Sequence, residues 1–141
     1  MKIVRLILAA AFVSALAAAP AAAQTAEDAF GVWEHPDNGS HIRIAKCNGG
    51  LCATIIKVKD PSRKDVHNPD PAKRDRPVEG ITIMSGAKKT GEAGWSGKLY
   101  NTQDGETYSG TVTVLSKDKL KLRGCVLGGL VCQGPTWTRV N

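Results

Sequence analysis

The feature that most constrains this chain is a repeated alternation of apolar and polar residues, interrupted by short turn sequences. The alternation has a period of two, which places successive side chains on opposite faces of a β-strand. It occupies residues 30–34, 40–46, 51–58, 81–84, 95–100, 107–115, 119–123 and 136–140. Most segments between these runs are rich in Gly, Asn and Asp, which favour hairpin turns. The sequence therefore predicts an antiparallel meander of about eight strands.

Closure of this meander follows from the properties of strand edges. A flat meander leaves two edges unpaired, and unpaired edges promote aggregation, whereas closure into a barrel removes them. A barrel of about eight strands has an interior that is either filled by side chains or wide enough for one small ligand. We therefore expect an all-β fold, a single antiparallel meander closed into a barrel. The sequence is compatible with both a filled interior and an interior that holds a ligand.

One long segment interrupts the alternation. Residues 59–79 contain four of the seven prolines of the chain and nearly balanced basic and acidic side chains. Loops of this length in compact domains are usually either functional or irregular connections. Two interpretations remain at this point: a solvated crossover between strands, or a cap over the mouth of the barrel.

The N-terminal segment has the pattern of a secretory signal peptide. Lys2 and Arg5 precede an apolar run over residues 6–16, and small residues follow at 21–23. The apolar run is too short for a membrane-spanning helix. No cysteine follows the expected cleavage point, so a lipoprotein anchor is not expected. The predicted organisation is a signal peptide at 1–23, a short tail at 24–29 and one β-barrel domain at 30–141.

The charge of the chain argues against nucleic-acid binding. The chain has 19 basic and 13 acidic residues, and two of the basic residues lie in the predicted signal peptide. Basic and acidic side chains are interspersed, whereas nucleic-acid-binding proteins carry a basic stripe, often with stacking aromatic residues.

The four cysteines fall into two closely spaced pairs. Each pair brackets a Gly-Gly dipeptide, at 49–50 and at 128–129. A Gly-Gly hairpin turn places its flanking residues opposite one another, within bridging distance. A Zn(Cys)₄ site is the rival interpretation, but its usual C-x₂-C spacing is absent. In an exported protein the pattern predicts two disulfides: Cys47–Cys52 and Cys125–Cys132.

A tryptophan near the start and an arginine near the end of the domain form a candidate structural latch. Trp33 lies on the first predicted strand and Arg139 on the last. These strands are neighbours if the meander closes. The Arg139 guanidinium would then lie over the Trp33 indole or bind nearby carbonyl groups.

Other aromatic and basic residues are candidates for ligand binding. An aromatic-lined cavity with a few polar groups is the usual small-ligand pocket, although aromatic side chains also fill cores. Two arginines of the long loop, Arg74 and Arg76, either bind an anionic head group or pair locally with Asp70 and Asp75. The tentative ligand-binding residues are Trp95, Tyr100, Tyr108, Trp137, Arg74 and Arg76.

No catalytic constellation is visible in the sequence. The three histidines lack metal-type spacing, and no G-x-S-x-G, phosphate-binding or dinucleotide-binding motif occurs. We therefore expect no enzymatic activity, no metal, and no cofactor.

Taken together, several motifs resemble the bacterial DUF2147 family of small exported proteins over residues 30–140. They are Gly31-x-Trp33, the Cys47/Cys52 hairpin, Asn68-Pro69-Asp70-Pro71 with Arg74 and Arg76-Pro77-x-x-Gly80, Gly97-x-x-Tyr100, Asp104-Gly105-x-Thr107-Tyr108, Arg123-Gly124-Cys125, and Thr136-Trp137-Thr138-Arg139. Asn101-Thr102 stands where the family frequently has Asp-Pro. The resemblance implies a lipocalin-like or avidin-like barrel that holds a small apolar molecule.

These observations lead to two functional hypotheses. The first is a soluble periplasmic β-barrel protein that binds a small hydrophobic ligand such as a fatty acid. The alternative is a cell-envelope interaction module with a fully packed barrel, in which loop 59–79 docks a protein partner. Neither hypothesis involves nucleic acid or a transmembrane span of the mature protein.

Overall fold

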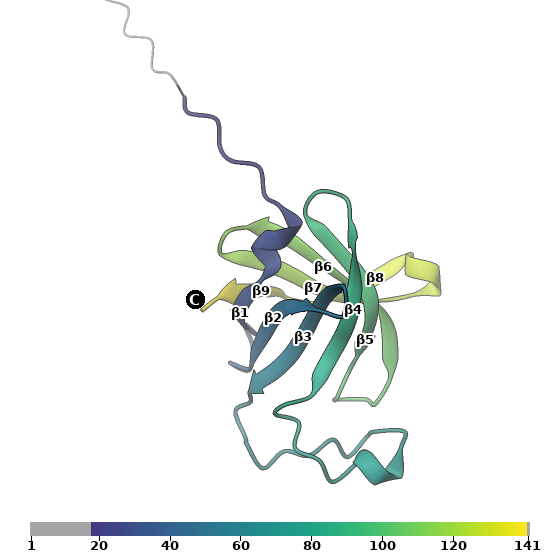
Figure 1. The fold of residues 1–141 in the computed structure, drawn as a ribbon. Coiled ribbons are helices and arrows are strands. Elements are labelled where there is room, and N and C mark those ends of the chain that lie inside the picture. Colours follow the sequence, from purple (N-terminus) through teal and green to yellow (C-terminus); the bar gives the residue numbers. More distant parts are fainter. Residues whose placement is uncertain (1–17, 141) are drawn as a thin grey trace, which may run out of the picture.

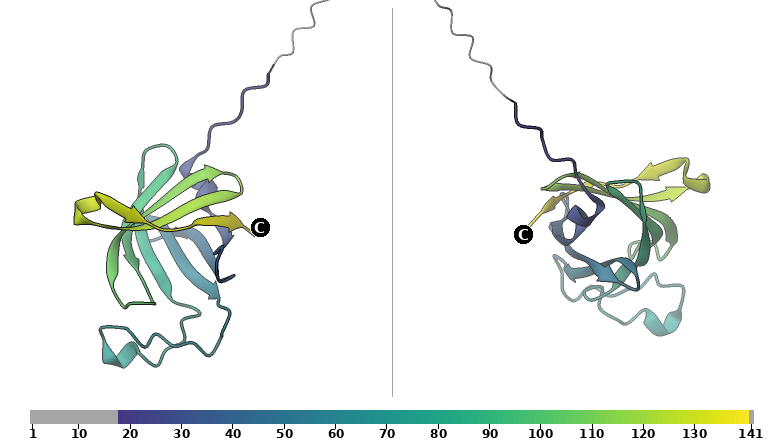
Figure 2. Two further views of the ribbon diagram at one scale, coloured as in Figure 1. Left: turned by 180° about the vertical axis from the view of Figure 1, so that it is seen from behind. Right: turned by 45° about the horizontal axis from the view of Figure 1, so that its top comes forward.

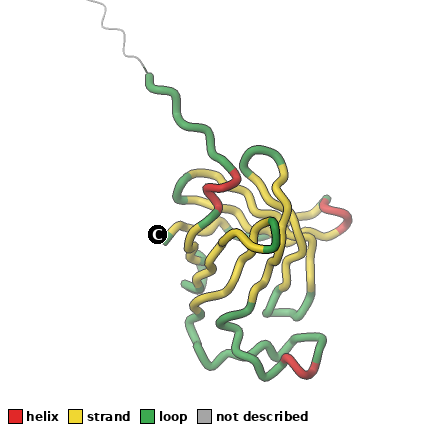
Figure 3. Tube along the Cα trace, viewed as in Figure 1, coloured by secondary structure: helices red, strands yellow, loops and turns green. Residues whose placement is uncertain are grey.

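The computed structural model describes residues 18–140 and contains nine strands and three short 3₁₀ turns (Figures 1 and 3). The strands are β1 (Gly31–Glu34), β2 (His41–Cys47), β3 (Gly50–Lys57), β4 (Thr82–Thr90), β5 (Gly94–Tyr100), β6 (Thr107–Ser116), β7 (Lys119–Val126), β8 (Val131–Gln133) and β9 (Thr136–Arg139). The turns are η1 (Ala26–Ala29), η2 (Pro71–Lys73) and η3 (Leu127–Gly129). Among these residues no helix is long and apolar enough to cross a membrane. The predicted signal peptide falls largely on residues outside the described part.

The strands form a closed antiparallel barrel, as predicted. Their order is β6-β5-β4-β3-β2-β1-β9-β7, and pairing of β6 with β7 completes the circle of eight strands. The first and last strands of the barrel are neighbours, with Trp33 opposite Arg139 and Glu34 opposite Thr138. The right-hand view of Figure 2 shows the strands as a ring with η1 at one end.

The ninth strand, β8, lies outside this circle and was not predicted. It pairs with the end of β7, whereas β9 pairs with the beginning of the same strand. The β7–β8 hairpin therefore projects beyond the barrel wall (Figure 2). A further difference is β4, which continues to Thr90. Its pairing with β5 has a register shift between Met84 and Lys88.

The core follows the predicted alternation. Ile42 and Ile44 on β2, Val112 on β6, and Leu120 on β7 are almost fully buried. Neighbouring positions such as Arg43 are exposed. A buried apolar side chain of this size contributes roughly 1.5–3 kcal/mol, so the inward rows provide the main driving force for closure.

One end of the barrel is sealed by η1, in the segment expected to be a short tail. Ala26 and Ala29 are completely buried. The indole nitrogen of Trp33 donates to the Ala29 carbonyl at 2.8 Å, and that of Trp95 donates to the Ala26 carbonyl at 2.7 Å. The ring of Phe30 packs against Trp95 at 5.7 Å between centroids. Residues before the first strand thus close this end of the interior.

Arg139 covers the outside of the same seal. Its guanidinium carbon lies 4.2 Å from the centroid of the Trp33 ring. The guanidinium donates to the Phe30 carbonyl at 3.0 Å, and also to the carbonyls of Asp28 and Lys117. A single side chain therefore connects the last strand to the first strand, to η1 and to the β6–β7 turn.

The structure contains both predicted disulfides, but the turns between the cysteines differ from those expected. Cys125 and Cys132 are directly opposite in the β7–β8 ladder, with a four-residue connection between the flanking valines in place of a two-residue Gly-Gly turn. In the β2–β3 hairpin the turn is Asn48-Gly49, both at positive φ, one position earlier than expected. Cys47 therefore faces Gly50, and its bond to Cys52 runs diagonally across the ladder.

Replacing Arg139 with Ala tests the stabilising role of this side chain. We expect the free energy of unfolding to fall by about 3 kcal/mol, because a cation–π contact and charged hydrogen bonds are lost together. The melting temperature should fall by roughly 10 °C for a domain of this size. Calorimetry on Arg139→Ala and on the matched control Arg43→Ala, which removes an exposed arginine of β2, measures the difference. Equal melting temperatures for the two variants would contradict a latch.

Candidate functional site

A cavity of about 510 Å³ occupies the end of the barrel opposite η1. This is the end from which the long β3–β4 connection emerges (Figure 1). The deeper wall of the cavity consists of inward-facing apolar side chains from six strands: Ile42, Ile55, Ile83, Leu99, Leu122 and Trp137. The period of two in the sequence places these side chains inside, and the interior is not completely filled at this end.

The rim of the cavity is polar and comes from loops. Arg63 reaches it from the β3–β4 connection, and Thr102 and Gln103 from the β5–β6 connection. The lining residues include no Asp, Glu or Lys. Arg63 is therefore the one lining residue with a permanent charge. His35 also lines the rim, and burial lowers the pKa of its imidazole below 6.5, which favours the neutral ring at pH 7.

The structure separates the four aromatic residues expected to line a pocket. Tyr100, Tyr108 and Trp137 line the cavity. Trp95 lies at the sealed end, packed against Phe30, and is not among the lining residues. The ring of Trp137 is buried and meets His35 edge-on at 4.8 Å between centroids.

The two arginines proposed for an anionic head group do not line the cavity either. The Nε of Arg74 donates to the carbonyl of Asn68 at 2.8 Å, and the side chain is otherwise exposed. Arg76 donates from Nε and Nη2 to one carboxylate oxygen of Asp65, at 3.0 and 2.8 Å. Its partner is thus Asp65 and not the neighbouring Asp75 considered from the sequence.

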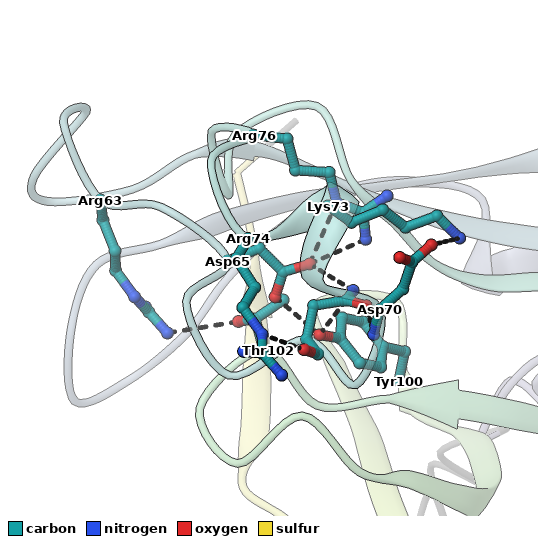
Figure 4. A network of polar contacts seen from close by, with 9 residues as sticks. Arg63, Asp65, Asp70, Lys73, Arg74, Arg76, Tyr100 and Thr102 are labelled. Carbon is teal, nitrogen blue, oxygen red and sulfur yellow. Dashed lines mark hydrogen bonds and ion pairs between the residues drawn. The ribbon is translucent and has the colours of Figure 1, made fainter.

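Asp65 is the centre of a buried polar network that fastens the long loop to the barrel (Figure 4). Its side chain is completely buried. The Tyr100 hydroxyl on β5 donates to it at 2.6 Å, and the amide of Asn68 donates at 2.8 Å. Together with Arg76 these donors satisfy both carboxylate oxygens, which a buried charge requires.

The network changes the ionisation of its members. Burial alone would raise the pKa of Asp65, but hydrogen bonds from Tyr100, Asn68 and Arg76 hold that pKa below the usual 3.8. Burial, reinforced by the adjacent carboxylate, raises the pKa of Tyr100 from 10.0 to about 12. Around neutral pH the network therefore consists of a carboxylate, a guanidinium and a neutral phenol.

The anchored loop positions residues at the cavity mouth. Backbone hydrogen bonds join Asp65 to Arg76 and Val78 to Arg63, at 3.0 Å each, so the loop folds back on itself as a narrow ribbon. Figure 3 shows that the rest of this connection is irregular apart from η2. Val78 and Arg63 line the cavity, and Arg63 donates to the buried Thr102 hydroxyl at 3.2 Å. The loop is therefore attached at the mouth in a defined conformation.

Sequence reasoning missed Asp65 and Arg63 as members of this region. Both lie in a stretch dense with charges, and nothing in their spacing distinguishes them from neighbouring acids and bases. Asn68 belongs to a motif that resembles the DUF2147 family, but the sequence assigned it no role.

Within residues 18–140, no group of three or more His, Cys, Asp or Glu side chains is arranged to hold a metal ion.

The closed barrel with one sealed end and one cavity defines a lipocalin-like protein. A structural comparison supports this class: the chain is similar to a protein described as "Protein HP1028 from the human pathogen Helicobacter pylori belongs to the lipocalin family". The two share 29% sequence identity with a TM-score of 0.68, over 79% of this chain and 82% of the other.

Within this class the family is also clear. Residues 31–139 match the profile of the family described as "Uncharacterized protein conserved in bacteria (DUF2147)", and the chain belongs to this family. No curated protein sequence matches the chain.

The pH dependence of stability tests the Asp65 network. Because the folded pKa of Asp65 is depressed, its contribution is fully present above the ordinary value of 3.8 and is lost as the pH falls through the folded pKa. We expect Asp65→Asn to lower the free energy of unfolding by about 2 kcal/mol at neutral pH. The deficit should shrink as the pH falls below 3.8.

Urea unfolding of the unmodified protein and of Asp65→Asn, from neutral pH to below 3.8, measures the effect. Asp75→Asn is the matched control, since Asp75 is exposed and its carboxylate pairs with the exposed Lys64, at 3.5 Å. A deficit in Asp65→Asn that is independent of pH would show that the carboxylate charge does not stabilise the loop.

Proposed function

We propose that this protein is a carrier or sensor that holds a small hydrophobic molecule, such as a fatty acid, inside its barrel. The observation that carries the proposal is the cavity of about 510 Å³, with an apolar interior, a polar rim and a sealed far end. Small-molecule sites typically have volumes of roughly 300–1,000 Å³, apolar walls and a few placed polar groups. The lipocalin-like class is compatible with such a role.

Burial is the main source of affinity in this proposal. The wall offers Ile55, Leu99 and Leu122 to an alkyl chain, and no acidic side chain lines the space. Removing an alkyl chain from water contributes about 0.8 kcal/mol per methylene group. Affinity should therefore increase with chain length until the chain fills the cavity.

The polar end of the ligand is assigned to Arg63. This guanidinium lines the rim, and the hydrogen bond to Thr102 fixes its position. Arg74 and Arg76, considered for this role from the sequence, are directed to Asn68 and Asp65. A ligand with an apolar tail and one carboxylate fits this arrangement, with its tail toward the strands and its carboxylate at Arg63.

We further propose that the protein works in the periplasm, after removal of residues 1–23. The basic start, apolar run and small residues of that segment support export. The two disulfides support an oxidising compartment, where such bonds persist.

The alternative of a partner-docking module with a packed barrel has less support. The cavity contradicts a fully packed interior. Loop 59–79 is also attached to the barrel by the Asp65 network, and its exposed charged side chains include both basic and acidic residues.

A chain-length series tests the hydrophobic ligand. Saturated fatty acids of increasing length should bind with a dissociation constant that falls roughly fourfold per methylene group until a limiting length. Tryptophan fluorescence reports the binding, since Trp137 lines the cavity whereas Trp33 and Trp95 lie at the sealed end. The variant Trp137→Phe should lose most of the signal while calorimetry still detects binding. A dissociation constant independent of chain length would refute a cavity-bound alkyl chain.

A charge variant tests the head-group assignment. We expect Arg63→Gln to weaken binding of a fatty acid by about 10- to 100-fold, because a charged hydrogen bond contributes about 1.5–3 kcal/mol. Binding of the alcohol of the same chain length should hardly change. Arg74→Gln is the control, with normal affinity for both ligands. Equal losses for acid and alcohol would show that Arg63 shapes the cavity without binding the head group.

A further inference from the structure

The β7–β8 hairpin presents an unusual cluster of exposed apolar side chains. Leu127 is 72% exposed and Leu130 86% exposed, and the flanking Val126 and Val131 are about half as exposed. No charged residue occurs from Gly124 to Thr138. We call residues 126–131 the hairpin tip. It projects from the barrel wall, as the left-hand view of Figure 2 shows in yellow and yellow-green.

The hairpin tip is held in a fixed shape. The Cys125–Cys132 disulfide joins its base where the two cysteines face each other across the ladder. Leu127 has a φ of 54°, in the left-handed region that glycine or asparagine occupies more readily. Folding alone would favour glycine at this position. Leu127 instead exposes most of its surface to water, so packing in the folded domain does not account for its apolar side chain.

The apolar surface of the tip is continuous with the cavity. Val126 and Val131 form a register pair, and both line the cavity mouth. Trp137 lies further along the same wall. An apolar track therefore leads from Leu127 and Leu130 to the interior of the barrel.

The strands next to the hairpin carry only positive charge. β5, β6 and β7 contain no Asp or Glu, whereas Lys98 is exposed and Lys121 and Arg123 are half-buried. Lys98 pairs with Ser109, which in turn faces Cys125 at the base of the hairpin. The remaining positions of this face are mainly serine and threonine. The combination of an apolar projection and a basic, hydroxyl-rich surface matches the interface of an anionic bilayer.

We propose that the hairpin tip docks this protein on a lipid bilayer that contains anionic phospholipids. Leu127 and Leu130 enter the boundary between head groups and acyl chains, and Lys98 and Arg123 lie at the level of the phosphates. The shape of the surface favours lipid over a protein partner, because the tip is convex and a few side chains wide. A stable protein interface typically buries about 1,200–2,000 Å² around a packed centre.

Vesicle flotation tests the docking without any barrel ligand, so its outcome does not depend on the proposed function. The sample is the predicted mature protein, which begins at residue 24. It retains η1 and every described strand and lacks the apolar residues 6–16. It should bind vesicles of phosphatidylcholine with phosphatidylglycerol and bind vesicles of phosphatidylcholine alone more weakly. Leu127→Ser with Leu130→Ser should reduce binding by more than about tenfold, with an unchanged melting temperature because both side chains are exposed.

Two control variants separate the contributions. Val66→Ser with Leu115→Ser removes exposed apolar residues elsewhere, on the long loop and on β6, and should bind like the unmodified protein. Lys98→Gln with Arg123→Gln should lose the preference for phosphatidylglycerol. Failure of the unmodified protein to float, or equal flotation of both apolar double variants, would overturn the proposal. So would self-association that Leu127→Ser with Leu130→Ser abolishes in sedimentation velocity, since the tip would then pair two copies of the chain.

Discussion

The pairing of the first and last barrel strands is the interaction on which the remaining structure depends. Without β1 beside β9, the meander has two open edges and no interior. The pairing itself is short, so side chains reinforce it: Arg139 lies over Trp33 and reaches the carbonyls of η1 and of the β6–β7 turn. The β1–β9 contact is thus reinforced by one cation–π contact and by the burial of η1, both at the same end of the barrel.

Because closure is concentrated at one end, the two ends of the barrel have different properties. The η1 end is filled by Trp33, Trp95 and Phe30, and its indole nitrogens are satisfied by backbone carbonyls. The other end is bordered by loops, and there the apolar interior meets water. The Asp65 network holds the longest of these loops, so that Arg63 stands at the rim of the cavity. A cavity with an apolar interior and a charged rim follows from this asymmetry.

The β7–β8 hairpin, proposed here to dock on a membrane, lies on the same side as the cavity. Its base belongs to the cavity wall, and its tip extends away from the barrel. If both proposals hold, a hydrophobic molecule would need a path from the bilayer to the interior of the barrel. The apolar track from Leu130 past Val131 toward Trp137 has the location such a path requires. The disulfide at the base of the hairpin maintains the alignment of this track with the cavity.

The sequence by itself determined the eight strands of the barrel, their inward faces, both cysteine pairs and the closure of the meander, but not β8 or the full length of β4. These features are local or follow from a rule with few solutions: alternation sets the face, and edges must be paired. Only the tertiary structure decided that Trp95 seals one end while Trp137 lines the cavity at the other, and that Arg76 binds Asp65 while Arg63 faces the cavity. Two tryptophans on inward faces have the same pattern at any height in a barrel. Their height depends on register across many strands, and the choice among equivalent charges depends on contacts such as Asp65 with Tyr100, between residues far apart in the chain.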